Sequence, residues 1–178
     1  MAHVPSFEMP RDEIKRELDR IRHPMRVVVD RAKNPFNVGA IIRTAHSFLP
    51  REIVLVGTEP WYERAAMGMH RLENIREIPS VEELLEVAAR EAWKLCCFEK
   101  DAASVGLWNA ELPEDAVLVF GNEDTGIDAR ILERAYETIA IPMYGINHSY
   151  PVSVAAGMGL CEWARRRYQH GRIVVPRG

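Results

Sequence analysis

Residues 116–126 read AVLVFGNEDTG, and this stretch decides the fold class. An apolar run without alternation passes directly into a polar loop that two glycines flank. Such a run is typical of a strand buried on both faces, as in a parallel sheet covered by helices. The strand is expected to span residues 116–121. Four further strands are predicted on the same grounds, over residues 25–30, 52–57, 94–98 and 138–142, and residues 74–78 could add a short one.

Helical patterns separate these strands along the chain. They cover residues 10–22, 40–48, 62–70, 81–92, 128–136 and 151–169. Alternating strands and helices predict an α/β fold built on a parallel sheet. Ligands of such folds bind at the carboxyl ends of the strands, so the loops after Asp30, Phe120 and Pro142 are the candidate sites. The absence of a Gly-x-Gly-x-x-Gly pattern after the first strand disfavours a dinucleotide-binding fold.

Composition is that of an ordinary globular protein. The chain has 178 residues, of which 47% are hydrophobic and 28% charged, and this size fits one domain. No apolar run reaches the ~20 residues that span a bilayer, and the first ten residues carry no apolar signal core, so we expect a cytoplasmic protein. Cys96, Cys97 and Cys161 lack metal-binding spacing and are expected to be buried free thiols.

Charge is distributed unevenly despite the net value of -3. Residues 163–178 contain five arginines and no acidic residue. A basic segment of this kind can bind a polyanion through phosphate contacts. The alternative is a solvated helix end, where arginines suit the helix dipole.

The first candidate loop leads into a helix through Asn37, Gly39 and Arg43. Asn37 is suited to cap the helix, and Gly39 would let another chain or a ligand approach the backbone. Arg43 lies one turn after Gly39, on the same face. The plainer interpretation is a capped helix with a surface arginine.

The other two loops follow the strands 116–121 and 138–142. In the second loop, Glu123 is a carboxylate held at a strand end, although the loop could be a plain connecting turn. The third loop precedes a helix in which Pro151 suits the first turn, and Ser149 could help to cap it. Gly157 and Gly159 within that helix suggest very close packing against a threaded chain or a partner helix.

Three motifs together resemble the SpoU/TrmH family of SPOUT methyltransferases. They are Asn37-x-Gly39-x-x-x-Arg43, then Phe-Gly-x-Glu-x-x-Gly over residues 120–126, then Ile-Pro-Met at 141–143 followed by Ser149 and Val-Ser-Val-Ala at 152–155. Each motif alone is weak, but three in this order, each after a strand, are specific. The resemblance covers residues 25–168. One departure is Pro151, which stands where the family usually has asparagine and which lacks a polar side chain.

The resemblance implies a fold and an activity. The fold would be a parallel-sheet SPOUT domain over residues 1–178, with residues 1–24 as a helical extension and residues 25–170 as a core that ends in a trefoil knot. The activity would be S-adenosylmethionine-dependent methylation of RNA, at a ribose 2′-hydroxyl and with tRNA favoured over rRNA. The protein would be a homodimer that needs no metal and no membrane.

The resemblance also assigns roles to individual residues. Arg43 would grip the target phosphate and polarise the ribose hydroxyl, since a guanidinium keeps its proton too firmly to serve as a base. The expected catalytic residues are Asn37, Arg43, Glu123 and Ser149. The expected cofactor-binding residues are Phe120, Gly121, Asn122, Glu123, Ile141, Met143, Ser149, Val152, Ser153 and Ala155. The expected RNA-binding residues are Arg31, Lys33, Arg43, Arg165, Arg166 and Arg167.

Two other functions stay open from the sequence. One is methylation of an RNA base, and the other is RNA binding by a knotted protein without turnover. Pro151 favours both, whereas Arg43 and Glu123 argue against loss of activity. Among the histidines that could accept a proton, His148 lies nearest the third motif, ahead of His46 and His70. The four tryptophans are expected to be packing residues rather than platforms for base stacking.

Overall fold

The computed structural model describes residues 8–30 and 34–167, and its centre is a parallel sheet. Within these residues the sheet has seven strands in the order β3-β2-β1-β6-β4-β7-β5. Every pairing between neighbouring strands is parallel, which confirms the predicted sheet type. The strands are β1 (Arg26–Asp30), β2 (Glu52–Val56), β3 (Ile75–Ile78), β4 (Lys94–Phe98), β5 (Val105–Gly106), β6 (Ala116–Phe120) and β7 (Glu137–Ala140).

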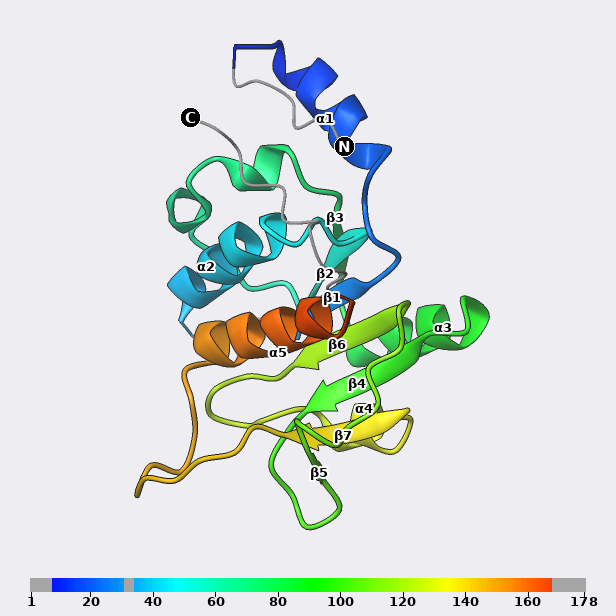
Figure 1. The fold of residues 1–178 in the computed structure, drawn as a ribbon, viewed down its shortest axis with the longest axis vertical. Helices are drawn as coiled ribbons and strands as arrows, with labels where there is room; N and C mark the ends of the chain where they lie inside the picture. Colours follow the sequence, from blue (N-terminus) through cyan, green and yellow to red (C-terminus); the bar gives the residue numbers. More distant parts are fainter. Residues whose placement is uncertain (1–7, 31–33, 168–178) are drawn as a thin grey trace.

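Helices cover both faces of this sheet, as Figure 1 shows. On one face, α2 and α5 pack against each other and over β1 and β6. The side chain of Trp163, which belongs to α5, is fully buried there. On the other face, α3 and α4 cover β4 and β6. The described helices are α1 (Arg11–Asp19), α2 (Pro35–His46), α3 (Val81–Arg90), α4 (Ala129–Leu132), α5 (Val152–Arg167) and the 3₁₀ turns η1 (Glu63–Ala66) and η2 (Met69–Arg71).

The two adjacent cysteines of β4 illustrate burial on both faces. Cys96 belongs to the core under α2 and α5, and Cys97 to the core under α3 and α4. Burial raises the pKa of each thiol to about 12, so both are held as neutral apolar side chains. The prediction of buried thiols is wrong for Cys161, which is exposed on α5. The prediction of a packing role is likewise wrong for Trp108, whose surface is 63% exposed.

Several predicted helix boundaries are wrong for local reasons. The helix cap expected at Asn37 is instead Asn34, whose side chain accepts from the Phe36 N–H at 3.0 Å, because α2 begins at Pro35. The helix predicted over 62–70 is two 3₁₀ turns, because Met67 and Gly68 both adopt positive φ. The helix predicted over 128–136 ends at Leu132, although Asp128 does cap it through the Arg130 N–H. The two-residue strand β5 was too short to predict.

Residues 8–24 are fastened to the core at one end of α2. Ile14 and Leu18 of α1 pack on Leu72 in a separate apolar cluster. Beyond α1, Arg22 donates to the buried carboxylate of Glu73 at 2.7 Å, and the same carboxylate lies 2.6 Å from His46 of α2. A carboxylate buried this deeply requires such partners, so the extension is held by a specific polar contact as well as by apolar packing.

Candidate active site at the carboxyl ends of the strands

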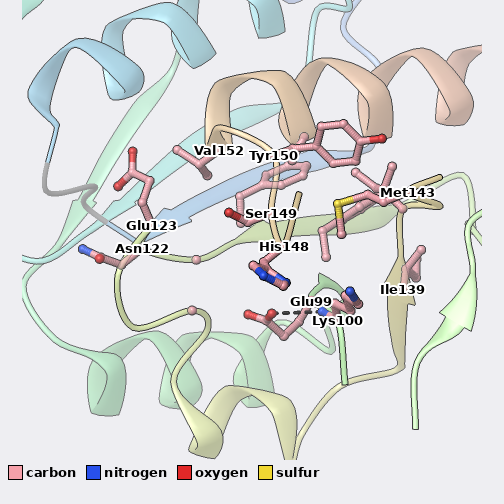
Figure 2. Close-up of a pocket in the computed structure, with 16 residues that line it drawn as sticks. Glu99, Lys100, Asn122, Glu123, Ile139, Met143, His148, Ser149, Tyr150 and Val152 are labelled. Carbon is pink, nitrogen blue, oxygen red and sulfur yellow. Dashed lines mark hydrogen bonds between the residues drawn. The ribbon is translucent and has the colours of Figure 1, made fainter. Parts of the chain in front are cut away.

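A cavity of about 220 Å³ opens at the carboxyl ends of β4, β6 and β7. Phe98 and Phe120 are the last residues of two of these strands. Both line the cavity, and their stacked rings have centroids 4.8 Å apart. In Figure 2, Asn122 and Glu123 lie at one end of the cavity, while Ile139 and Met143 lie at the other. The cavity is where a parallel α/β fold is expected to bind its ligand.

The turn over residues 121–127 forms one wall of this cavity. Asn122 and Gly126 exchange two backbone hydrogen bonds, of 2.9 and 3.1 Å, which close the turn. The returning chain then crosses directly over Gly121, where a Cβ atom would lie 2.4 Å from the carbonyl carbon of Gly126. Gly121 therefore admits its own backbone at this crossing, and it contributes main-chain atoms to the cavity.

Glu99 holds the same turn from the neighbouring strand. Its Oε2 accepts a hydrogen bond from the Ile127 N–H at 3.0 Å, and its Oε1 accepts from the Lys100 N–H at 2.9 Å. The Ser104 hydroxyl donates to the Glu99 carbonyl oxygen at 2.8 Å. Glu99 thus connects the loop after β4 with the turn after β6.

The third loop closes the cavity opposite this turn. The Tyr150 hydroxyl donates to the carbonyl oxygen of Pro142 at 3.0 Å, which joins the two ends of the loop. Met143, His148, Ser149 and Tyr150 all line the cavity. The tip of the loop points away, because Tyr144 and Ile146 are each 96% exposed.

A second polar cluster joins α2, α5 and the turn after β6 beside the cavity. The Ser153 hydroxyl donates to Asn37 Oδ1 at 2.9 Å, and the Asn37 amide donates to Glu123 Oε1. These contacts fix which way the Asn37 amide faces. Glu123 is therefore shared between this cluster and the cavity lining.

Arg43 stands apart from both groups. It is exposed on α2, and it makes no hydrogen bond or ion pair with any residue that the structure describes. Its neighbour one turn earlier, Gly39, is buried, and a Cβ there would lie 2.7 Å from the Tyr62 carbonyl oxygen. Close approach at Gly39 is therefore by this chain's own 62–66 segment, not by a second chain or a ligand.

Two of the three arginines in the last turn of α5 donate hydrogen bonds to backbone carbonyl oxygens within the protein. Arg166 donates to the Leu107 and Ala110 carbonyl oxygens and to the buried Glu162. Arg167 donates to the carbonyl oxygens of Trp163 and Leu112, with its guanidinium 4.3 Å from the Trp163 ring. Only the Arg165 side chain of the three is largely exposed, at 66%, although it also pairs with Glu162.

The cavity gathers most but not all of the residues expected to bind a cofactor. Of the ten, nine line it, whereas Ser153 faces Asn37 instead. Glu123 and Ser149 of the expected catalytic residues also line it, but Asn37 and Arg43 do not. Arg31 and Lys33 lie outside the described residues. His148, a candidate proton acceptor, lines it too, and so do six residues that had no predicted role: Phe98, Glu99, Lys100, Gly126, Ile139 and Tyr150.

A signal for part of this omission was present in the sequence. The apolar stretch 94–98 is followed at once by Glu99 and Lys100, just as Phe120 is followed by a polar loop. Applying the rule of carboxyl strand ends to this strand as well would have found both residues.

The described residues contain neither a candidate metal site nor a helix that could span a membrane. Over 8–30 and 34–167, no group of three or more histidine, cysteine, aspartate or glutamate side chains could hold a metal ion. Within the same ranges, no helix combines the length and the apolar character needed to cross a membrane.

The fold and the cavity define the class of protein: an α/β protein whose parallel sheet is covered by helices on both faces, with a cavity at the carboxyl ends of its strands. Comparison with known proteins makes this specific. Residues 24–161 match the model of the SpoU rRNA methylase family, and the chain belongs to that family.

Individual relatives resemble most of the chain. The tRNA (guanosine(18)-2′-O)-methyltransferase of Aquifex aeolicus is 30% identical over 92% of this chain and 79% of its own length. A 23S rRNA (guanosine-2′-O-)-methyltransferase of Acinetobacter baylyi is 29% identical, over 79% of this chain and 59% of its own length. The crystal structure of an AdoMet-bound rRNA methyltransferase from Sinorhizobium meliloti superposes with a TM-score of 0.74 at 29% identity, covering 85% of this chain and 61% of that chain.

Proposed function

We propose that this protein is an S-adenosylmethionine-dependent RNA methyltransferase that modifies a ribose 2′-hydroxyl, with tRNA as its substrate. One observation carries the proposal. The second and third family motifs come together around a single cavity at the strand ends. The relatives with which the chain shares its family are named as 2′-O-methyltransferases of tRNA and rRNA, and a structural neighbour binds the cofactor.

The chemistry of the cavity fits this cofactor. Apolar side chains, among them Phe98, Ile139 and Val152, suit an adenine ring, and the main chain at Gly121 can approach a ligand closely. The carboxylate of Glu123 suits a positively charged ligand. S-adenosylmethionine would supply a methyl group on a positively charged sulfur, which makes that methyl carbon electrophilic.

The chain's own residues would align the acceptor. The site would have to hold the ribose oxygen in line with the methyl group that the cofactor supplies, and it would have to let the hydroxyl proton pass to water. Arg43 would grip the adjacent phosphate and polarise the hydroxyl, using a guanidinium that makes no hydrogen bond or ion pair with the described residues. Asn37, held by Ser153 and Glu123, would position the substrate or Arg43, while Ser149 would complete the site.

The proposal includes the assembly and topology that the family resemblance implies. We place residues 1–24 as an extension of a single catalytic domain that ends in a trefoil knot. In support, the chain leaves β7 beyond β4 and returns by the 141–151 loop to α5, which lies on α2 (Figure 1). We also propose a homodimer, in which a second subunit or RNA covers Arg43. We also propose that the enzyme acts in the cytoplasm.

One observation favours a second function, methylation of an RNA base. Pro151 stands where the family usually carries asparagine, so a polar group that could orient the acceptor is missing. That departure would suit a different target atom, on an RNA base.

Transfer of a labelled methyl group tests the proposal. The purified protein is incubated with methyl-labelled S-adenosylmethionine and either RNA or DNA of the same sequence. We expect label in RNA and none in DNA, because only RNA carries the 2′-hydroxyl. Binding of the cofactor without label in any RNA would contradict the catalytic proposal, and label in both polymers would favour a base as the target.

A further inference from the structure

Glu99 is the one acidic side chain of the cavity that lies outside the three family motifs. It comes directly after β4, whereas the motif residues follow β6 and β7 or lie on α2 and α5. In Figure 2 its carboxylate lies at the edge of the cavity, beyond His148 as seen from Ser149. Its place suggests a role in building the pocket.

We propose that Glu99 is a positioning residue for cofactor binding, which acts by anchoring the turn 121–127 across β4 and β6. This inference rests on the proposed function, because it takes the cofactor to bind in this cavity. Glu99 would set the affinity for the cofactor and leave the methyl-transfer step itself unchanged.

The hydrogen bonds of the carboxylate carry the argument. Glu99 accepts a hydrogen bond from the Ile127 N–H, and Ile127 is only 5% exposed. A buried N–H must be paired, so without Glu99 the chain at Ile127 would have to move or admit water. Either change would alter the wall of the cavity, which this turn forms.

The crossing of the chain explains why this anchor matters locally. The backbone at Gly126 and Ile127 passes within van der Waals contact of Gly121, and Gly126 has a φ of +70°. A Cβ at Gly126 would lie 2.6 Å from the Glu99 carboxylate oxygen. The glycine therefore lets the carboxylate reach the turn, and the carboxylate fixes how far the turn stands from β4.

Asp101 offers a matched control in the same loop. Its carboxylate also accepts a backbone N–H, from Ala103 at 2.7 Å, and it too follows β4. It does not line the cavity, and its carboxylate accepts hydrogen bonds from the Ala103 N–H and the Ser104 hydroxyl, which belong to the same loop. Removing its carboxylate disturbs the loop after β4 while leaving the anchor to Ile127 in place.

Calorimetric titration with S-adenosylhomocysteine tests the inference on the wild type, Glu99→Ala, Glu99→Gln and Asp101→Ala. The Kd of Glu99→Ala should rise about tenfold or more, as expected when a hydrogen bond to a charged group is lost. Glu99→Gln keeps one acceptor oxygen for the Ile127 N–H and should fall between Glu99→Ala and the wild type. Asp101→Ala should bind as the wild type does.

Kinetics separate positioning from a general loss of structure. The KM for S-adenosylmethionine should rise in Glu99→Ala, while kcat at saturating cofactor stays near the wild-type value. Wild-type affinity in both Glu99 variants, or an equal loss in Asp101→Ala, would overturn the inference. If Glu99→Ala does not fold, Glu99→Gln decides, because an unchanged KM there would also overturn it. Failure of the wild type to bind would instead overturn the proposed function and, with it, this inference.

Discussion

The turn 121–127 and the outer surface of α2 carry two parts of the same candidate site, yet they are built in opposite ways. The turn is enclosed by its own chain, with backbone crossing at Gly121 and a carboxylate anchor from Glu99. On α2, Arg43 is exposed and has no partner among the described residues. The turn is held by contacts within the chain, whereas the Arg43 side chain is held by no hydrogen bond or ion pair among the described residues.

The difference separates two tasks. A cofactor pocket must present fixed main-chain groups before the ligand arrives, which favours a turn held by many internal contacts. A group that acts on a polymer substrate must remain free until that substrate binds. Arg43 satisfies this second requirement, whereas Asn37, which is held by Ser153 and Glu123, belongs with the fixed groups.

The largest effect on the methylation rate is expected at Arg43, the exposed residue of the site. Arg43→Ala should lower the single-turnover rate at saturating RNA and cofactor by about 10²–10³-fold, the cost of losing a group that stabilises reacting charge. Cofactor affinity should stay unchanged, because the cavity does not include Arg43. Arg43→Lys should not rescue, since lysine lacks the planar fork of donors. The exposed Arg134→Ala serves as a control. A near-normal rate in Arg43→Ala would make this arginine an ordinary surface residue.

The next effect concerns the enclosed turn. Gly121→Ala should destabilise the fold by about 3 kcal/mol, because the added Cβ would press on the Gly126–Ile127 backbone, which cannot move as a side chain can. Denaturant unfolding measures the loss. Gly145→Ala, in the third loop, is the matched control, since nothing lies within 4 Å of its added Cβ. Equal stability of the two variants would show that the crossing is not as tight as described.

The smallest effects separate arginines of α5. Arg166→Ala should cost about 2 kcal/mol of folding free energy, because it removes donors to two carbonyl oxygens and to buried Glu162. Arg165→Ala should cost clearly less, because an exposed ion pair adds little to stability. If Arg165 contacts a phosphate, its loss should also reduce the salt dependence of RNA binding by about one unit of slope. Equal stability losses would contradict the internal role of Arg166.

Strand character was readable from the sequence because it depends on local composition. Six of the seven strands within the described residues were predicted, five of them from apolar runs, and the rule of carboxyl strand ends located the cavity at the loops after Phe120 and Pro142. The helix start at Pro35 was missed because two asparagines compete for the cap, although a proline at the first helical position favours Asn34.

Side-chain partners were not readable in the same way. Ser153 was expected at the cofactor, but the direction in which α5 faces turns it toward Asn37. Three consecutive arginines, 165–167, look equivalent in sequence, yet helical geometry sends Arg166 and Arg167 onto the 107–112 segment and leaves Arg165 exposed. Glu99 could have been found as a residue that directly follows a buried strand, but its contact with the Ile127 N–H depends on the adjacency of β4 and β6, which no local pattern encodes.

Alkaline digestion of the labelled RNA tests the central claim most directly, because it locates the transferred methyl group. Alkali cleaves RNA through attack by the 2′-hydroxyl, so a methylated ribose protects its own phosphodiester bond. We predict that the label is recovered in alkali-resistant dinucleotides, and that it becomes a 2′-O-methylnucleoside after enzymatic digestion. Recovery of the label in ordinary mononucleotides would place the methyl group on a base and would contradict the account.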